Sequence, residues 1–327
     1  MGEAPEDGTA AAAGPDPALP TVKRERGWLR AAGLFAVALS LSAIEPSVLV
    51  GVPFAFFVLA FPTRRLATLL AGVLAVMLVF GGGERAALWY AERGWAIILG
   101  GWFVALTVRW PESTFTDRAL GSVGGAAAVV AILLGLQPGS WGVLDWLVSE
   151  RMMAGVSTFL EALRVLRGEA GAVSSALVAT VYQTAEVQAL VFPALLGLAS
   201  MAALGVAWWL YLRLAMGEDS ALGPVREFRF NDHLVWFFIA GLVLVAVGRS
   251  GGWARTGSNA VVFMGTLYAL RGAAVVLFFN GGMSLLGFVL LGVGLLFAWP
   301  VIGVGALVIG LGDTWLDLRE RARELVA

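Results

Sequence analysis

Residues 190–214 read LVFPALLGLASMAALGVAWWLYLRL and contain a single charged side chain, Arg213. As an α-helix this stretch extends about 37 Å, which is enough to cross the roughly 30 Å hydrocarbon core of a bilayer. An apolar run of this length with almost no charge is typical of a transmembrane helix. Similar runs recur along the chain, so this pattern decides the fold class.

Apolar stretches of about fifteen to twenty-five residues fill most of the chain from Trp28 to Asp313. The candidate spans are 28–44, 47–61, 66–83, 95–110, 119–137, 190–214, 234–250, 257–279, 283–298 and 299–314. Glu45-Pro46 divides the first pair and Trp299-Pro300 the last pair, so each pair is either two tilted helices or one long helix with a broken partner. The chain is therefore predicted to be all-α, a polytopic transmembrane helical bundle of eight to ten spans with an extramembrane amphipathic segment.

The composition supports this class and excludes several kinds of site. The chain is 59% hydrophobic and 14% charged, with mean hydropathy +0.84, whereas soluble domains are about 25% charged. It has no cysteine and one histidine, which excludes disulfides, iron–sulfur clusters and His-rich or Cys-rich metal sites. No cofactor and no metal site are predicted. The sequence has neither a phosphate-binding motif nor a block of basic residues, so no nucleic-acid partner is predicted. The predicted partner is the lipid bilayer.

The chain divides into five predicted parts. Residues 1–22, rich in Ala, Gly, Pro and acidic residues, are expected to be a disordered tail. Residues 23–137 and 190–315 hold the N-terminal and C-terminal transmembrane helices. Residues 138–189 form an extramembrane amphipathic segment, and residues 316–327 a charged cytoplasmic helix.

The 138–189 segment begins with a turn signal at Pro138-Gly139 and continues with apolar residues at helical spacing. Trp141 and Trp146 favour a first helix that lies at the membrane interface. The simpler interpretation is a helical hairpin that rests on the membrane face. The alternative is a lid or a docking element for a partner protein.

Basic residues predict the orientation. With ten spans and the N-terminus inside, Lys and Arg are about twice as frequent in the inner segments as in the outer ones. Both termini are therefore expected in the cytoplasm. The abundance of Ala, Gly and Val, with Lys23 as the single lysine, is typical of a GC-rich bacterial genome, so the predicted location is the bacterial cytoplasmic (inner) membrane.

Arg271 is the most unusual side chain in the predicted spans, because long apolar sequence separates it from the next charge on either side. A buried guanidinium needs a carboxylate, a carbonyl or a ligand anion. Two interpretations stay open: a salt bridge to a carboxylate on another helix, or recognition of an anionic group.

Asn280 and Asp313 are the other candidate ligand-binding groups. Asn280 precedes two glycines at the end of a span, where a simple turn is the commoner explanation. Asp313 closes the last apolar run, where the alternative to ligand binding is a pair with Arg319 or Arg271.

No residue is predicted to be catalytic, and the chain is expected not to be an enzyme. It lacks the Gly-x-Ser-x-Gly and His-Glu-x-x-His patterns and a pair of intramembrane aspartates. His233 follows Asn231-Asp232, one of which is expected to cap the helix that begins at 234.

Four short sequences follow one another in the C-terminal half. They are Phe192-Pro193-Ala-Leu-Leu, the stretch Phe228-Arg-Phe-Asn-Asp-His-Leu-Val-Trp236, the stretch from Asn259 to Tyr268-Ala-Leu-Arg271-Gly272, and Gly312-Asp313-Thr-Trp-Leu-Asp317-Leu-Arg319. In this order they resemble the YybS-like family of predicted bacterial membrane proteins, a domain of unknown function (DUF2232), over about residues 28–320. The family is similar in architecture to the substrate-binding subunits of energy-coupling-factor vitamin transporters and to the MreD cell-shape proteins.

This resemblance implies a helical membrane fold, and two functional hypotheses follow. The first is a transport-related subunit that binds a small molecule among its C-terminal helices, near Arg271, Asn280 and Asp313. The alternative is a non-catalytic scaffold in cell-envelope or cell-shape assembly, in which 138–189 and the C-terminal helix hold a membrane or cytoplasmic protein partner. A cavity lined by polar groups would favour the first hypothesis, and a filled bundle would favour the second.

Overall fold

A computed structural model describes residues 27–41, 45–80, 87–167, 174–217, 225–248, 251–281 and 285–324. Within these ranges the chain forms α-helices, three short helices of other types and no strand. The α-helices are α1 (Gly27–Leu41), α2 (Pro46–Ala60), α3 (Arg65–Phe80), α4 (Ala87–Arg109), α5 (Phe115–Gly135), α6 (Ser140–Arg167), α7 (Ser175–Leu190), α8 (Phe192–Tyr211), α9 (Val235–Gly248), α10 (Gly252–Phe279), α11 (Leu285–Leu316) and α12 (Leu318–Glu324). The short helices are η1 (Leu212–Met216), η2 (Val225–Glu227) and η3 (Asp232–Leu234). The all-α prediction is confirmed, and the predicted tail 1–22 lies outside the described residues.

In the described part of the chain, three helical segments are long and apolar enough to cross a bilayer: Phe115–Gly135, Phe192–Met216 and Gly252–Phe279. A fourth follows if Pro300–Leu316 and Leu318–Glu324, bent by 60°, count as one span. The expected eight to ten spans are therefore not confirmed. The physical reason is length, because α2 and α3 have 15 and 16 residues and extend only about 22–24 Å. Both are mostly apolar, yet shorter than the bilayer core.

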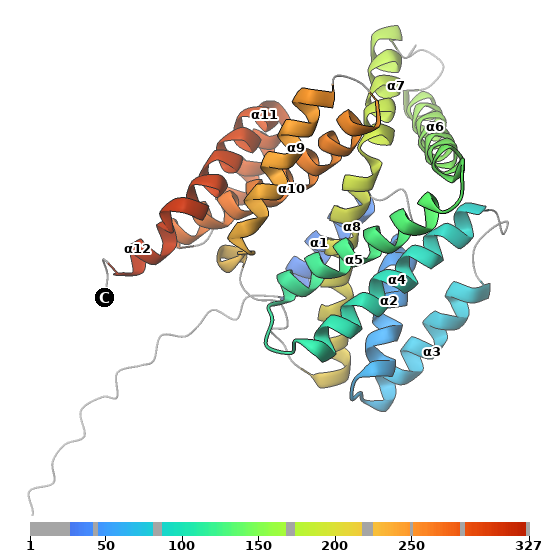
Figure 1. Cartoon of the computed structure of the whole chain (residues 1–327), viewed down its shortest axis with the longest axis vertical. Coiled ribbons are helices and arrows are strands. Elements are labelled where there is room, and N and C mark those ends of the chain that lie inside the picture. Colours follow the sequence, from blue (N-terminus) through green and yellow to red (C-terminus); the bar gives the residue numbers. More distant parts are fainter. Residues whose placement is uncertain are drawn as a thin grey trace, which may run out of the picture.

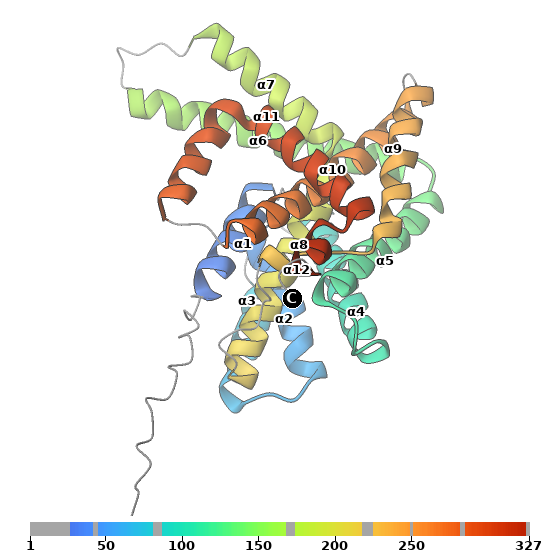
Figure 2. The ribbon, with the colours of Figure 1, turned by 90° about the vertical axis from the view of Figure 1, so that its left-hand side faces the viewer.

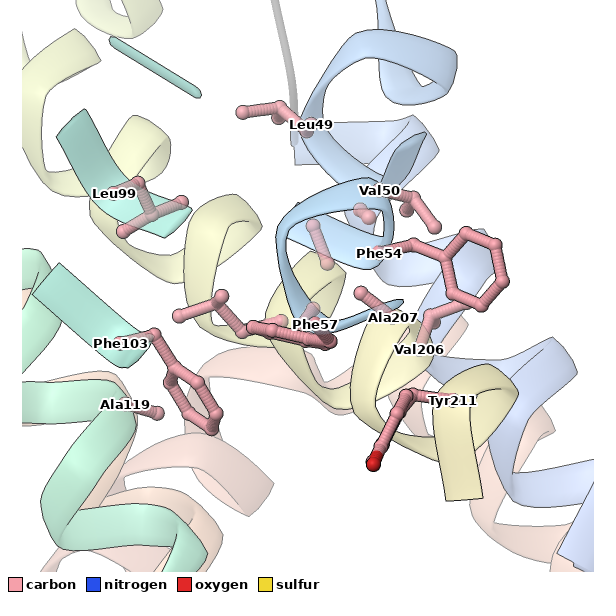
Figure 3. Close-up of a cluster of buried hydrophobic side chains, with 14 of the residues drawn as sticks. Leu49, Val50, Phe54, Phe57, Leu99, Phe103, Ala119, Val206, Ala207 and Tyr211 are labelled. Atoms are coloured by element: carbon pink, nitrogen blue, oxygen red, sulfur yellow. The ribbon is translucent and has the colours of Figure 1, made fainter. Parts of the chain in front are cut away.

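α8 lies at the centre of the N-terminal helices (Figures 1 and 2), with α1, α2 and α5 packed around it. Its many alanines and glycines allow neighbouring helices to approach closely. Figure 3 shows Phe57 of α2 and Phe103 of α4 in this core, with Ala207 and Tyr211 of α8 beside them. The rings of Phe57 and Phe103 are 5.0 Å apart between centroids.

α9, α10 and α11 form the C-terminal group of helices (Figure 1), and glycines allow their backbones to touch. A Cβ atom on Gly272 of α10 would lie 1.8 Å from the Ala306 carbonyl oxygen of α11. A Cβ atom on Gly310 of α11 would lie 1.9 Å from the Tyr268 carbonyl oxygen. No side chain fits at either position, so the two helices cross at direct backbone contact.

The predicted break at Trp299-Pro300 is present. α11 (Leu285–Leu316) consists of two helices joined at a kink, because its backbone leaves the helical conformation at Ala298, where φ is −131° and ψ is 28°. Pro300 explains the break, because a proline ring lacks the N–H donor and clashes with the preceding turn. Within the described residues the last pair of stretches is therefore two helical segments that meet at this kink.

α6 and α7 form the helical hairpin expected between 138 and 189, and they pack through Val156, Leu160 and Ala185. The hairpin lies at the end of the molecule where α8 begins (Figures 1 and 2). A bidentate ion pair between Asp145 of α6 and Arg255 of α10, with Nη2–Oδ1 at 2.6 Å, ties it to the C-terminal helices. Its place outside the membrane stays a prediction, as does the division of the chain into five parts.

The junction between α7 and α8 is bridged by one side chain of α10. The Asn259 amide nitrogen donates to the Leu190 carbonyl oxygen at 3.0 Å, and its amide oxygen accepts from the Ala194 N–H at 2.9 Å. Both backbone groups flank Val191, where the helix is interrupted before Pro193. Asn259 therefore satisfies the Ala194 N–H and shares the Leu190 carbonyl with Arg255, whose Nε donates to it at 3.4 Å.

Candidate functional site

The Arg271 guanidinium is buried in the middle of the C-terminal helices, with no exposed surface. Leu267 and Val275, one turn away on either side, are also buried. The helical position therefore carries Arg271 into the apolar interior, where an ion needs partners of opposite charge. Two other segments of the chain supply those partners, η3 with Asp232 and α11 with Asp313.

Asp313 of α11 is the first partner of Arg271. The Arg271 Nε donates to Asp313 Oδ2 at 2.9 Å, and Nη2 donates to the Asp313 carbonyl oxygen at 3.3 Å. Asp313 is only 2% exposed. The pairing that the sequence offered as the alternative to ligand binding is therefore present.

Asp232, at the start of η3, is the second partner. The Arg271 Nη1 donates to Asp232 Oδ1 at 2.5 Å. The Phe230 ring covers the guanidinium, with its centroid 5.6 Å from the Arg271 Cζ atom, an arrangement that adds a cation–π attraction. The segment that leads into α9 is thereby fixed to α10.

Arg319 of α12 is the second buried arginine that binds Asp313, and with Arg271 it forms the inner layer of the network. Its Nη2 donates to Asp313 Oδ2 at 2.8 Å, and its Nη1 donates to the carbonyl oxygens of Arg226 and Phe228 at 3.2 and 3.1 Å. Asp317, between α11 and α12, has a positive φ of 44°, which turns the chain so that Arg319 faces back toward Asp313. One carboxylate oxygen thus receives two guanidinium groups.

Arg229 forms an outer, more exposed layer with Asp232, Asp317 and Glu320 at 3.3, 2.6 and 3.8 Å. Partial burial lowers the pKa of Arg229, and the hydrogen bonds and charges of Asp232 and Asp317 raise that pKa by more, so the net direction is upward. Arg229 therefore stays charged wherever the carboxylates are ionised.

The structure brings together two of the three candidate ligand-binding residues. Asn280 is apart from them: it is exposed at the end of α10, where its amide donates to the Val276 carbonyl oxygen at 3.0 Å. Gly281 follows with φ of 64°, so the two residues form the turn that was the commoner explanation. A ligand-binding role for Arg271, Asn280 and Asp313 stays a prediction.

Asp232 is the residue of the network that sequence reasoning missed. Its neighbour Asn231 caps η3 as expected, since the Asn231 side chain accepts from the His233 N–H at 2.9 Å. A helix cap was a sufficient explanation for Asn231-Asp232 in the sequence. Nothing in the sequence around Asp232 indicated its contact with Arg271, 39 residues away. The need of the buried Arg271 for an anion was the one indication in the sequence that could have pointed to Asp232.

Glu92 of α4 was also missed. It is 5% exposed, and within the described residues its Oε1 atom has no hydrogen-bond partner. In the sequence Glu92-Arg93 marks the polar boundary before the span that begins at 95. The helix begins earlier, at Ala87, and this extension carries Glu92 inside.

The network holds four segments together: α10, α11, α12 and the loop that leads into α9. All three guanidinium nitrogens of Arg271 donate to protein oxygens. Asp313 lies between the two arginines Arg271 and Arg319, so positive and negative side chains alternate. Such an arrangement fixes the relative positions of helices in an apolar environment. In the described parts of the chain no group of three or more His, Asp and Glu side chains could hold a metal ion.

The apolar helices and the buried ion network together define an all-α integral membrane protein. The sequence agrees, because the family described as "Predicted membrane protein (DUF2232)" matches residues 31–314. The chain belongs to this family. No curated protein and no solved structure matches it.

Proposed function

We propose that this protein is a non-catalytic scaffold of the bacterial cytoplasmic membrane, which presents the α6–α7 hairpin and α12 to partner proteins of cell-envelope or cell-shape assembly. One observation carries the proposal: Arg271 and Asp313, the side chains best suited to hold a polar ligand, bind each other. A ligand there would have to break a buried ion pair, which costs about 3–5 kcal/mol.

The α6–α7 hairpin supports a docking role through its own surface. It has a small core of its own, yet Trp146, Val165 and Leu166 are 60%, 78% and 82% exposed. The charged side chains Glu161 and Arg164 lie between these apolar residues in the sequence. An exposed apolar surface with polar residues around it is typical of a contact with a protein or a membrane.

A photo-crosslinker tests this role. The chain has no cysteine, so Glu161→Cys gives a single attachment point on the hairpin in intact cells. We expect protein adducts of discrete mass, which Leu166→Asp abolishes without lowering the amount of protein in the membrane. A crosslinker at Glu112, on the loop between α4 and α5, is the matched control. If crosslinkers at Glu161 and at Glu112 gave the same adducts, or if Glu161 gave none, the proposed scaffold role would be contradicted.

The second candidate is the small-molecule-binding, transport-related subunit. One observation favours it: Arg118 is a partly buried guanidinium that meets no carboxylate in the described part of the chain. Native mass spectrometry of the purified chain separates the two candidates. A scaffold carries only lipids, whereas a stoichiometric small molecule other than a lipid that Arg118→Leu releases and Arg164→Leu retains would favour the transport-related subunit.

A further inference from the structure

Arg118, in the first turn of α5, is a partly buried cation whose charge no carboxylate of the described residues balances. Arg271, Arg319 and Arg255 each meet an aspartate. Within the described ranges Arg118 forms no ion pair, and its contacts are with two polar oxygens and two aromatic rings. A guanidinium removed from water in this way is a binding group for an anion.

The contacts of Arg118 leave most of its donors unused. Nε donates to the Thr114 carbonyl oxygen and Nη1 donates to Thr107 Oγ1, both at the long distance of 3.4 Å. Nη2 has no hydrogen-bond partner in the described residues. A guanidinium has five N–H groups in a planar fork, so an outer edge remains that matches two oxygens of a phosphate.

Aromatic rings position the group. The Arg118 Cζ atom lies 5.2 Å from the Trp208 ring centroid of α8 and 5.7 Å from the Phe103 ring centroid of α4. Figure 3 shows Phe103 and Ala119, the residue that follows Arg118, on facing helices of this region. The rings hold the cation without neutralising it.

The nearest acid in the sequence is already occupied. Asp117 Oδ2 accepts from Thr114 Oγ1 at 2.8 Å, and the same hydroxyl accepts from the Asp117 N–H at 3.2 Å. This reciprocal pair caps α5. Asp117 is thereby held as a helix cap at the exposed start of α5, and it lies outside ion-pair distance of Arg118.

The surrounding end of the molecule is basic. The Tyr211 hydroxyl donates to the Pro62 carbonyl oxygen at 2.9 Å, and Arg64 donates to the Met216 carbonyl oxygen at 3.3 Å, so the ends of α2 and α8 meet there. Among the described residues this end carries, besides Arg118, the acidic side chains of Glu112 and Asp117 and the exposed arginines Arg64, Arg65, Arg109 and Arg213. Basic side chains at the end of membrane helices attract anionic phospholipids.

We propose that Arg118, held between Trp208 and Phe103, binds the phosphate of an anionic group at this basic end of the helices. The phosphate belongs to an anionic lipid headgroup or is free phosphate from the water. Nη2 and Nη1 donate to two phosphate oxygens, and Arg64 and Arg213 add long-range attraction. The site is separate from the Arg271 network and does not depend on the scaffold role.

Lipid titration of the full-length chain in a neutral detergent, followed by native mass spectrometry, tests the proposal. The probes are phosphatidylglycerol, phosphatidylcholine and inorganic phosphate. We expect one phosphatidylglycerol to bind wild type more tightly than phosphatidylcholine, and Arg118→Gln to weaken that binding at least about tenfold, because a charge-assisted pair of hydrogen bonds is lost. Arg109→Gln, which removes an exposed arginine at the same end, should change binding less than about threefold.

Each result either identifies the anion at Arg118 as a lipid headgroup or as free phosphate, or contradicts the proposed binding site. Phosphatidylglycerol binding that depends on Arg118 assigns a lipid headgroup, whereas stabilisation by inorganic phosphate alone, lost in Arg118→Gln, assigns a free anion. Equal binding of every probe to wild type and Arg118→Gln overturns the proposal. If Arg118→Gln fails to fold, Arg118→Lys keeps the charge but not the planar fork, and unchanged phosphatidylglycerol affinity in that variant overturns it as well.

Discussion

Arg271 illustrates how one residue can require a whole arrangement of helices. Its apolar surroundings and its distance from other charges were visible in the sequence, and a pair of Asp313 with Arg271 or Arg319 was the alternative to ligand binding; the structure has both pairs. Asp232 was not, because its position in a local cap motif concealed a contact made only in the folded chain. Sequence reasoning could state that the guanidinium needs an anion, but not which of several carboxylates the helix packing brings near.

Arg271→Leu should lower the free energy of unfolding by about 3–5 kcal/mol, because it leaves the buried Asp313 with one cation in place of two. Asp313→Asn should have a similar effect, and the two changes together should cost less than their sum. Denaturant titration in detergent micelles measures these changes. Arg164→Leu, on the exposed face of α6, is the control and should stay within about 0.5 kcal/mol of wild type. Wild-type stability of Arg271→Leu would show that the network contributes nothing.

The glycines of the α10–α11 crossing make a second prediction. Gly272→Ala places a methyl group 1.8 Å from a carbonyl oxygen, so the helices must separate, at a cost of about 1–3 kcal/mol or more. Gly303→Ala in the same α11 meets no atom within 4 Å and should be neutral or stabilising by up to about 1 kcal/mol. Thermal unfolding followed by circular dichroism compares the two. Equal melting temperatures would contradict the close crossing.

At the scale of elements, apolar periodicity and proline positions located most helices to within a few residues. α10 begins at Gly252 rather than at 257 because Arg255, which would end an apolar run, finds Asp145 on α6. α5 begins earlier than expected because Thr114 caps it. Sequence hydropathy measures only the apolar part of a helix, whereas polar turns at its ends are stabilised by partners that hydropathy does not record.

The break between α7 and α8 gives the prediction for elements. Asn259→Ala leaves the Ala194 N–H without a partner and leaves the Leu190 carbonyl with only the longer bond from Arg255 Nε at 3.4 Å, at a cost of about 1–3 kcal/mol. Hydrogen exchange should rise locally at residues 190–195, while α3, far from the break, keeps wild-type protection. Asn280→Ala, which removes an exposed amide that bonds only its own helix, is the matched control. Unchanged exchange at the break would contradict the bridging role.

At the scale of the whole molecule, the fold class followed from composition, but the number of spans did not. A count of apolar stretches treats 15 residues and 25 residues alike, although only the longer helices reach across a bilayer without tilt or thinning. Long-range packing of α2 against α8, and of α3 against α2, decides how these short helices meet the lipid. That packing depends on contacts far apart in the chain.

Orientation is a prediction for the whole molecule. Both termini are expected in the cytoplasm and the α6–α7 hairpin outside, from the bias of basic residues. A membrane-impermeant maleimide should therefore label Glu161→Cys in intact cells, and should label Glu324→Cys only after the membrane is opened. Glu161 and Glu324 are both exposed acids on helices, so their intrinsic reactivity as cysteines is comparable. The reverse labelling pattern would invert the topology.

The ion network also has a consequence for biosynthesis. Asp232 precedes Arg271 by 39 residues and Asp313 follows it by 42. At about 5–20 residues per second, a ribosome needs about 2–8 seconds to complete the second partner after the arginine is made. During that interval Asp232 is the counter-ion already available to Arg271 in the newly inserted helix. The half-exposed Asp232 can therefore balance the charge of Arg271 until Asp313 has been synthesised.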